Sequence, residues 1–219
     1  MQRLLAVTVV LGAVGLTPAQ PPPPKAPEAP PVRFGLPYRP KAYPQATPKQ
    51  ALESVIITVE KGEFPYLVAH LLDPAFVDTR LAERARQFEP LVEDELVKLR
   101  ALQKQNPDRV APEARVPDDL GRLRALVADR AHERAFRQLA RDVQEKLADD
   151  PEALKELRQF LRLGMFPDAG AGDTARVGLP KIKERALFFR KIGDRWFVEN
   201  RQADERKPPA ESKPDEKKD

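Results

Sequence analysis

The sequence predicts an α+β fold in which N-terminal and central helices pack on a C-terminal antiparallel sheet. Two observations support this prediction. Apolar residues recur at helical spacing through most of residues 47–163. After Gly164 the pattern changes to short alternating and aromatic-rich runs, which are typical of strands and end in a hairpin.

The hairpin is the clearest strand pattern in the chain. Its two aromatic-rich runs flank Gly193-Asp194, a pair that suits a two-residue turn with glycine at a position of positive φ. With that pair as the loop, Phe189 lies opposite Val198, and a further strand is expected at Thr174–Leu179. One face of the hairpin then carries the side chains that we expect in a core or pocket, which are Leu187, Phe189, Trp196 and Val198. A lone hairpin is marginally stable in water, so the upstream helices must bury it.

Both ends of the chain differ from the middle in composition. Residues 1–20 resemble a secretory signal peptide, with Arg3 before an apolar run and small residues near an expected cleavage after Ala19; retention as a membrane anchor is the alternative. Residues 21–46 are rich in proline and predict a disordered linker. Residues 201–219 are charged, carry no large apolar side chain and predict a disordered tail. A single domain at 47–200 remains.

Caps and prolines divide the helical part of this domain. Thr47 caps the first helix with Pro48 at its first position, and Asp150-Pro151 starts the last helix in the same way. Pro90 is expected to end one helix and start another, because proline lacks the backbone donor that a helix interior needs. The expected helices lie at about 48–61, 64–72, 75–88, 90–104, 119–147 and 151–163.

The composition excludes several kinds of site. The chain has no cysteine, which excludes disulfides, thiolate catalysis and cysteine zinc sites. The net charge is +4 with acids and bases interleaved, so no dense basic stripe is present and no nucleic-acid partner is expected. Neither His70 nor His132 has a second histidine at ligand spacing, and Gly170-Ala171-Gly172 lacks the lysine of a phosphate loop. We therefore expect no metal and no cofactor.

Three weak catalytic candidates lie at or near the second helix. His70 and Asp73 are three residues apart, a spacing that would suit an acid–base pair, and Tyr66 lies one turn earlier. We expect His70 to face solvent, because it lies at the edge of the buried stripe formed by Leu67, Val68, Leu71 and Leu72. The sequence therefore assigns no catalytic residue.

Several short runs stand in a recognisable order. Thr47–Leu52, Glu60–Phe64 and Leu71–Pro74 open the domain, and Leu187–Val198 closes it with an aromatic run, a turn and a tryptophan-bearing strand. This order resembles nuclear transport factor 2-like domains (SnoaL-like, ketosteroid-isomerase-like), particularly uncharacterised exported members, over about 47–76 and 172–200. The resemblance implies a cystatin-like arrangement of helices on a curved antiparallel sheet, often around a cone-shaped pocket where enzymes of the family place Asp, Tyr or His.

The chain also departs from that family pattern. The middle, at about 81–163, carries more helix, so an enlarged helical segment is expected. Only three strands are visible, where the family's sheet usually has more. No motif of the family maps onto Tyr66, His70 or Asp73, so no catalytic role is carried over.

A pocket-forming resemblance without a catalytic constellation predicts a non-catalytic binding or interaction domain. With a cleaved leader it would be secreted or periplasmic, and it would meet a membrane only if the leader is retained. Its partner would be a small apolar ligand or another envelope protein, held in a pocket or on a helical surface. The first alternative is a small isomerase or hydrolase with His70 and Asp73 as its acid–base pair. A weaker alternative is a helical periplasmic chaperone.

Overall fold

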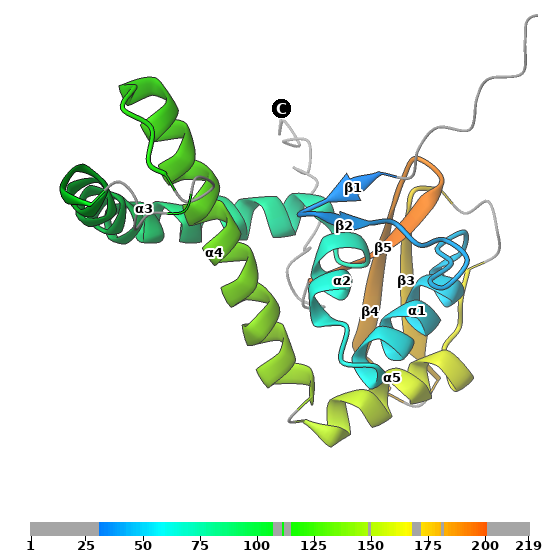
Figure 1. The fold of residues 1–219 in the computed structure, drawn as a ribbon. Coiled ribbons are helices and arrows are strands. Elements are labelled where there is room, and N and C mark those ends of the chain that lie inside the picture. Colours follow the sequence, from blue (N-terminus) through cyan, green and yellow to red (C-terminus); the bar gives the residue numbers. More distant parts are fainter. Residues whose placement is uncertain are drawn as a thin grey trace, which may run out of the picture.

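The computed structural model describes residues 31–106, 111, 115–148, 150–167, 172–180 and 182–200. Within them the expected α+β class is confirmed (Figure 1). The helices are α1 (Pro48–Glu60), α2 (Phe64–His70), α3 (Pro74–Gln105), α4 (Leu120–Ala148) and α5 (Pro151–Leu163). The strands are β1 (Val32–Arg33), β2 (Leu36–Pro37), β3 (Thr174–Leu179), β4 (Ile182–Ile192) and β5 (Arg195–Glu199).

The main sheet is antiparallel and has the order β3-β4-β5. Its hairpin has the expected register, in which Phe189 pairs with Val198 and Ile192 pairs with Arg195 around the two-residue turn. Gly193 adopts a φ of 60°, the left-handed conformation for which a glycine was expected. The position of β3 is also as expected.

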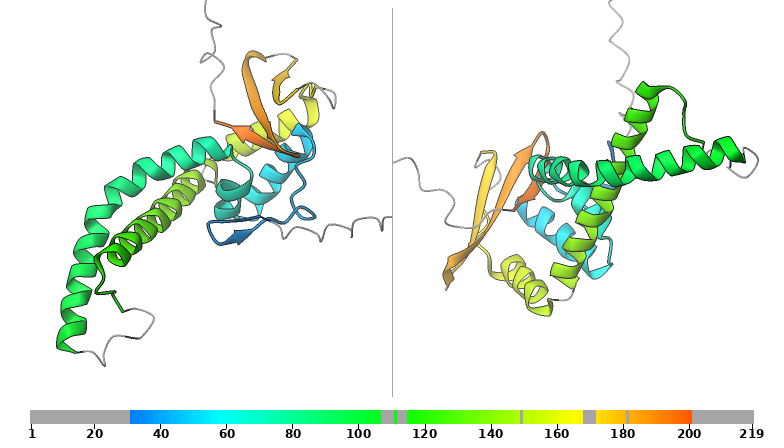
Figure 2. Two further views of the ribbon diagram at one scale, coloured as in Figure 1. Left: turned by 90° about the horizontal axis from the view of Figure 1, so that it is seen from above. Right: turned by 90° about the vertical axis from the view of Figure 1, so that its left-hand side faces the viewer.

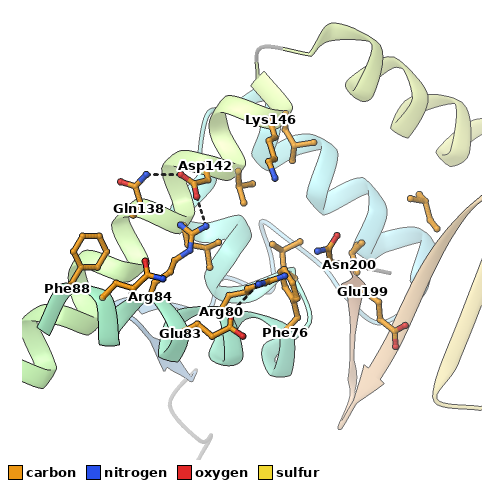
Figure 3. Close-up of a pocket in the computed structure, with 17 residues that line it drawn as sticks. Phe76, Arg80, Glu83, Arg84, Phe88, Gln138, Asp142, Lys146, Glu199 and Asn200 are labelled. Atoms are coloured by element: carbon orange, nitrogen blue, oxygen red, sulfur yellow. Dashed lines mark hydrogen bonds and ion pairs between the residues drawn. The ribbon is translucent and has the colours of Figure 1, made fainter. Parts of the chain in front are cut away.

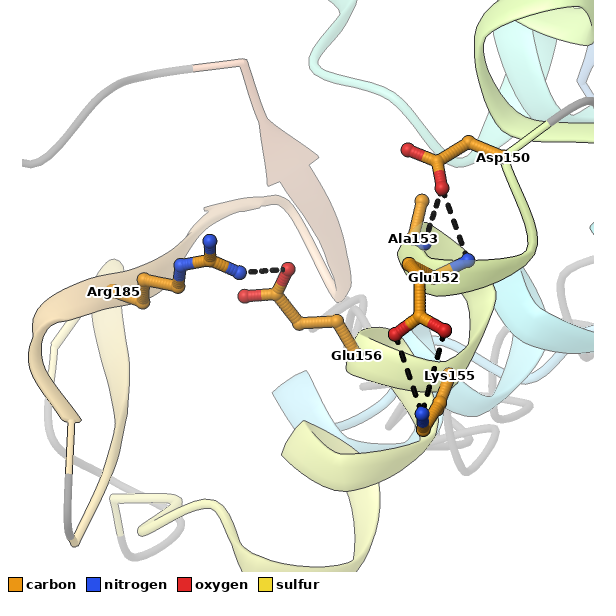
Figure 4. A network of polar contacts seen from close by, with 6 residues as sticks. All are labelled: Asp150, Glu152, Ala153, Lys155, Glu156 and Arg185. Atoms are coloured by element: carbon orange, nitrogen blue, oxygen red, sulfur yellow. Dashed lines mark hydrogen bonds and ion pairs between the residues drawn. The ribbon is translucent and has the colours of Figure 1, made fainter.

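Helices α1 and α5 cover one face of this sheet (Figure 1). Leu52 of α1 and Phe160 of α5 belong to the same buried apolar cluster as Phe189 and Trp196 of the hairpin. Asp150 caps α5 by accepting hydrogen bonds from the backbone of Glu152 and Ala153 at 3.0 and 3.1 Å (Figure 4). An ion pair of 2.7 Å between Glu156 of α5 and Arg185 of β4 joins helix and sheet at the surface (Figure 4).

Helices α3 and α4 pack mainly on each other and project from the body of the fold as an arm (Figure 2). Their shared cluster includes Leu81, Val92 and Leu96 of α3 with Ala131 and Ala135 of α4. The expectation that all central helices lie on the sheet is therefore wrong for most of their length. The expected enlargement of the helical middle takes the form of this arm.

The expected break at Pro90 is also wrong, because α3 is continuous over 32 residues. Proline removes one backbone donor from the helix and bends it, and α3 is visibly curved (Figure 2). Pro90 is exposed, so its ring displaces no core side chain. Packing of the following turns onto α4, through Val92 and Leu96, holds the helix together across the proline.

Residues 31–46, which we call the N-terminal strap, differ most from the prediction. The sequence places them in a disordered linker, but β1 and β2 pair in this segment and Tyr43 and Gln45 are only 1% and 2% exposed. Tyr43 packs with Val55 and Tyr66 in a buried cluster, so aromatic burial outweighs the proline-rich composition here. The expected signal peptide, residues 21–30 and the charged tail lie outside the described residues.

The strap and the α2–α3 junction together cover the outer edge of β5. The backbone of Val198 exchanges two hydrogen bonds of 2.9 Å with Leu71 and Asp73. Further along the edge, the amide of Trp196 donates to the carbonyl of Gln45 at 2.9 Å. The side-chain amide of Gln45 donates to the carbonyls of Trp196 and His70 at 2.8 and 2.9 Å. The edge strand is thus paired by segments that are far away in sequence.

Candidate functional site

A groove of about 780 Å³ lies between the base of the arm and the sheet (Figure 3). Its walls come from the first turns of α3, the last turns of α4, the α2–α3 junction, the middle of β4 and the end of β5. The groove exists because α3 and α4 leave the body at an angle and do not lie flat on the sheet (Figure 2).

Apolar side chains from both sides line this groove. The helices contribute Phe76, Phe88, Leu139, Val143 and Leu147, and the sheet side contributes Leu72, Leu187 and Val198. Aromatic and aliphatic walls of this kind are typical of pockets for small molecules.

Charged side chains of the two helices form the polar part of the lining, and most of them are paired. Arg84 of α3 and Asp142 of α4 form an ion pair of 2.5 Å across the groove, and Gln138 donates to the same carboxylate at 2.8 Å (Figure 3). Arg80 and Glu83 form a second pair of 3.0 Å along α3. Lys146 of α4 lines the groove without a carboxylate partner among the described residues.

Of the four hairpin residues expected in a core or pocket, two lie in the core and two line the groove. Phe189 and Trp196 lie in the core, 0% and 7% exposed. Leu187 and Val198 are half-buried and line the groove.

Sequence reasoning missed the helical walls of the groove. The pattern was present in the spacing: Phe76, Arg80, Arg84 and Phe88 follow one another at four-residue intervals on one face of α3. Such a face, with two basic residues between two aromatic ones, is also compatible with a solvated helix. Only the position of α3 relative to the sheet in the folded chain shows that this face lines a groove.

His70 is placed otherwise than expected. We expected a solvent-facing side chain, but His70 is only 2% exposed. Its Nε2 lies 2.8 Å from the carbonyl oxygen of Leu36 in the strap, and its ring packs near Tyr66 and Tyr38 at centroid distances of 4.8 and 5.8 Å. The expectation was wrong because the strap covers this side of α2. Burial lowers the pKa of His70, and the positive charge of the nearby Arg195 lowers it further, against the hydrogen bond to the carbonyl oxygen of Leu36, which raises it.

Asp73 and Tyr66 have structural partners. Asp73 caps α3 by accepting a hydrogen bond of 3.1 Å from the amide of Ala75, and its other carboxylate oxygen lies 3.7 Å from Arg190 on the sheet. The hydroxyl of Tyr66 accepts a hydrogen bond of 3.0 Å from the amide of Arg39, and burial raises the pKa of this phenol. Neither these residues nor His70 lines the groove. The structure therefore does not gather the three candidates into one cavity.

Among residues 31–106, 115–148 and the later described ranges, no three acidic, histidine or cysteine side chains converge as a metal site would require. None of the helices described is long and apolar enough to cross a membrane. In comparisons of the chain with protein-family models, curated proteins and solved structures, none matches.

Proposed function

We propose that the chain is an exported, non-catalytic binding domain of the nuclear transport factor 2-like kind, and that its groove takes a small apolar ligand. The observation that carries the proposal is the groove itself. Its volume of about 780 Å³ falls within the range of roughly 300–1,000 Å³ that is typical of small-molecule sites. Its walls combine an apolar surface with a few charged groups, as such sites usually do.

The lining supports binding over catalysis. Among the described residues that form it, none is a histidine, serine, threonine, tyrosine or cysteine, the types that most often act as nucleophile or general base. Asp142 and Glu83 are held in ion pairs. The enzyme alternative rests on His70 and Asp73, and these side chains are committed to Leu36 and Arg190 outside the groove.

The family assignment rests on the order of the motifs and on the arrangement of α1 and α5 against an antiparallel sheet. Three strands are fewer than the family pattern implies, and the groove lies beside the sheet, toward the arm. Export rests on residues 1–20. Intact-mass measurement of protein expressed with its leader tests it, with cleavage near Ala19 expected and a mature species that still starts at Met1 as the contrary result.

Ligand binding is tested with the neutral apolar fluorophore N-phenyl-1-naphthylamine. We expect saturable fluorescence enhancement, and we expect Val143→Trp to weaken binding at least ~10-fold, because the bulky indole ring takes up space in the groove that the ligand needs. Leu187→Trp, from the opposite wall, should have the same effect, which guards against a folding defect of one variant. Val97→Trp is the matched control, because Val97 is 57% exposed on the arm. Absence of saturable binding, or equal binding by all three variants, would reject the groove as the site.

A second candidate, the helical chaperone, is favoured by one observation. The arm exposes four large apolar side chains, each more than half exposed, which are Leu91, Val97, Leu102 and Leu120. Suppression of aggregation of a reduced, unfolded test protein measures this activity. The triple variant Leu91→Gln, Val97→Gln, Leu102→Gln should abolish suppression if the arm acts as a chaperone surface, and an unchanged effect would exclude that role.

A further inference from the structure

One positive charge in the groove, that of Lys146, is not balanced by an ion pair among the described residues. Arg80 and Arg84 are neutralised by Glu83 and Asp142. Lys146 has no carboxylate partner among the described residues, and its ammonium group points from α4 into the groove (Figure 3). Glu199 also belongs to the lining, but its carboxylate is turned away from Lys146 (Figure 3). Among the described lining residues, Lys146 therefore carries a positive charge that no ion pair balances.

Apolar side chains lie directly beside this charge. Val143 and Leu147 are neighbours of Lys146 on the same helix, three residues before it and one after it. Leu187 and Val198 form the facing wall on the sheet. A ligand that matches both features has an apolar chain and a single negative charge at one end.

We propose that the groove binds a single-chain anionic amphiphile, specifically a long-chain carboxylate whose head group pairs with Lys146 and whose chain lies along the apolar walls. This inference rests on the proposed function, because it assigns a ligand class to the same groove. The hydrocarbon chain supplies most of the affinity through burial. The ion pair supplies selectivity for the charge, and since Lys146 is exposed to solvent, that selectivity is modest.

Competition with N-phenyl-1-naphthylamine tests the inference. Dodecanoate, dodecanol and dodecyltrimethylammonium are compared below their critical micelle concentrations, with the full chain. We expect dodecanoate to bind about fivefold more tightly than dodecanol, as a solvent-exposed ion pair allows, and dodecyltrimethylammonium to bind most weakly. The preference for dodecanoate should shrink as salt concentration rises.

Three variants locate the charge that is responsible. Lys146→Met keeps the apolar stem and should reduce dodecanoate affinity to that of dodecanol, while dodecanol binding stays unchanged. Lys146→Arg keeps the charge and should keep the preference. Lys49→Met removes an exposed lysine on α1, far from the groove lining, and should have no effect.

The possible failures are distinguishable. If dodecanoate and dodecanol bind the unaltered chain equally, or if Lys146→Met retains the preference, the head-group inference is overturned and the apolar groove stands. If Lys49→Met weakens dodecanoate binding as much as Lys146→Met does, the attraction comes from the overall positive charge, and the inference is again overturned. If neither the fluorophore nor any dodecyl compound binds, both the inference and the proposed function fail.

Discussion

Replacing Gln45 with methionine tests whether the N-terminal strap is part of the fold. Methionine keeps the length and bulk of the side chain but donates no hydrogen bond. The substitution therefore leaves the carbonyls of His70 and Trp196 without the donor that now reaches them at 2.9 and 2.8 Å. The side chain is 2% exposed, so water does not easily replace that donor.

The expected cost follows from these contacts. Each buried acceptor that loses its partner costs about 1–3 kcal/mol. Part of this cost is offset, because the Oε1 atom of Gln45 is itself buried without a hydrogen-bond partner among the residues that the structure describes, and methionine removes it. We therefore expect Gln45→Met to lower the free energy of unfolding by about 2–4 kcal/mol.

Urea unfolding followed by the fluorescence of Trp196 measures this change. Trp196 is the single tryptophan of the chain and is 7% exposed, so its emission reports on loss of the core. The matched control is Gln105→Met at the exposed end of α3, where a change within about 0.5 kcal/mol is expected. Equal unfolding free energies for the two variants would show that the strap contributes nothing to the stability of the domain, contrary to the structure.

Two further perturbations concern His70 and Pro90. Burial and the charge of Arg195 lower the pKa of His70 in the folded state, so the unfolded chain takes up the proton first as the pH falls below about 6.5. The free energy of unfolding should therefore decline as the pH falls from about 6.5 through the folded-state pKa of His70. Urea unfolding at pH 7.5 and 5.5 should show this decline in the control variant His132→Gln and a weaker decline in His70→Gln. Equal declines in the two variants would contradict the prediction. Pro90→Ala restores a backbone donor at an exposed helix position and should raise the free energy of unfolding by up to about 3 kcal/mol. A lower urea concentration at the midpoint of unfolding would instead show that the packing of α3 on α4 requires the bend.

The elements that local chemistry determines were predictable from the sequence. The register of the hairpin follows from Gly193-Asp194, because a two-residue loop leaves one way to pair the flanking strands. The start of α1 follows from Thr47, whose side chain accepts from the amide of Gln50 at 3.1 Å. The side chain of Gln50 accepts from the amide of Ala46 at 3.0 Å, whereas in a capping box it would accept from the amide of the capping residue Thr47.

The features that depend on distant packing were not predictable. The proline content of residues 21–46 indicated a linker. This prediction failed for residues 31–46 because composition does not reveal that Tyr43 and Gln45 have buried partners on α2 and β5. His70 was assigned to the surface for the same reason. The groove depends on the angle at which α3 and α4 leave the body, which no local pattern specifies (Figure 2).

The contact between Gln45 and Trp196 has a consequence for the order of folding. These residues are 151 positions apart, so this contact of the strap cannot form until nearly all of the domain has been synthesised. The arm, in contrast, is built from two helices that follow one another in the chain, and it can form early. Loop closure over such a long separation is slow compared with helix pairing. The incomplete chain therefore leaves the surface that β5 later covers open to water, and this is the stage at which premature association with other chains is most favoured.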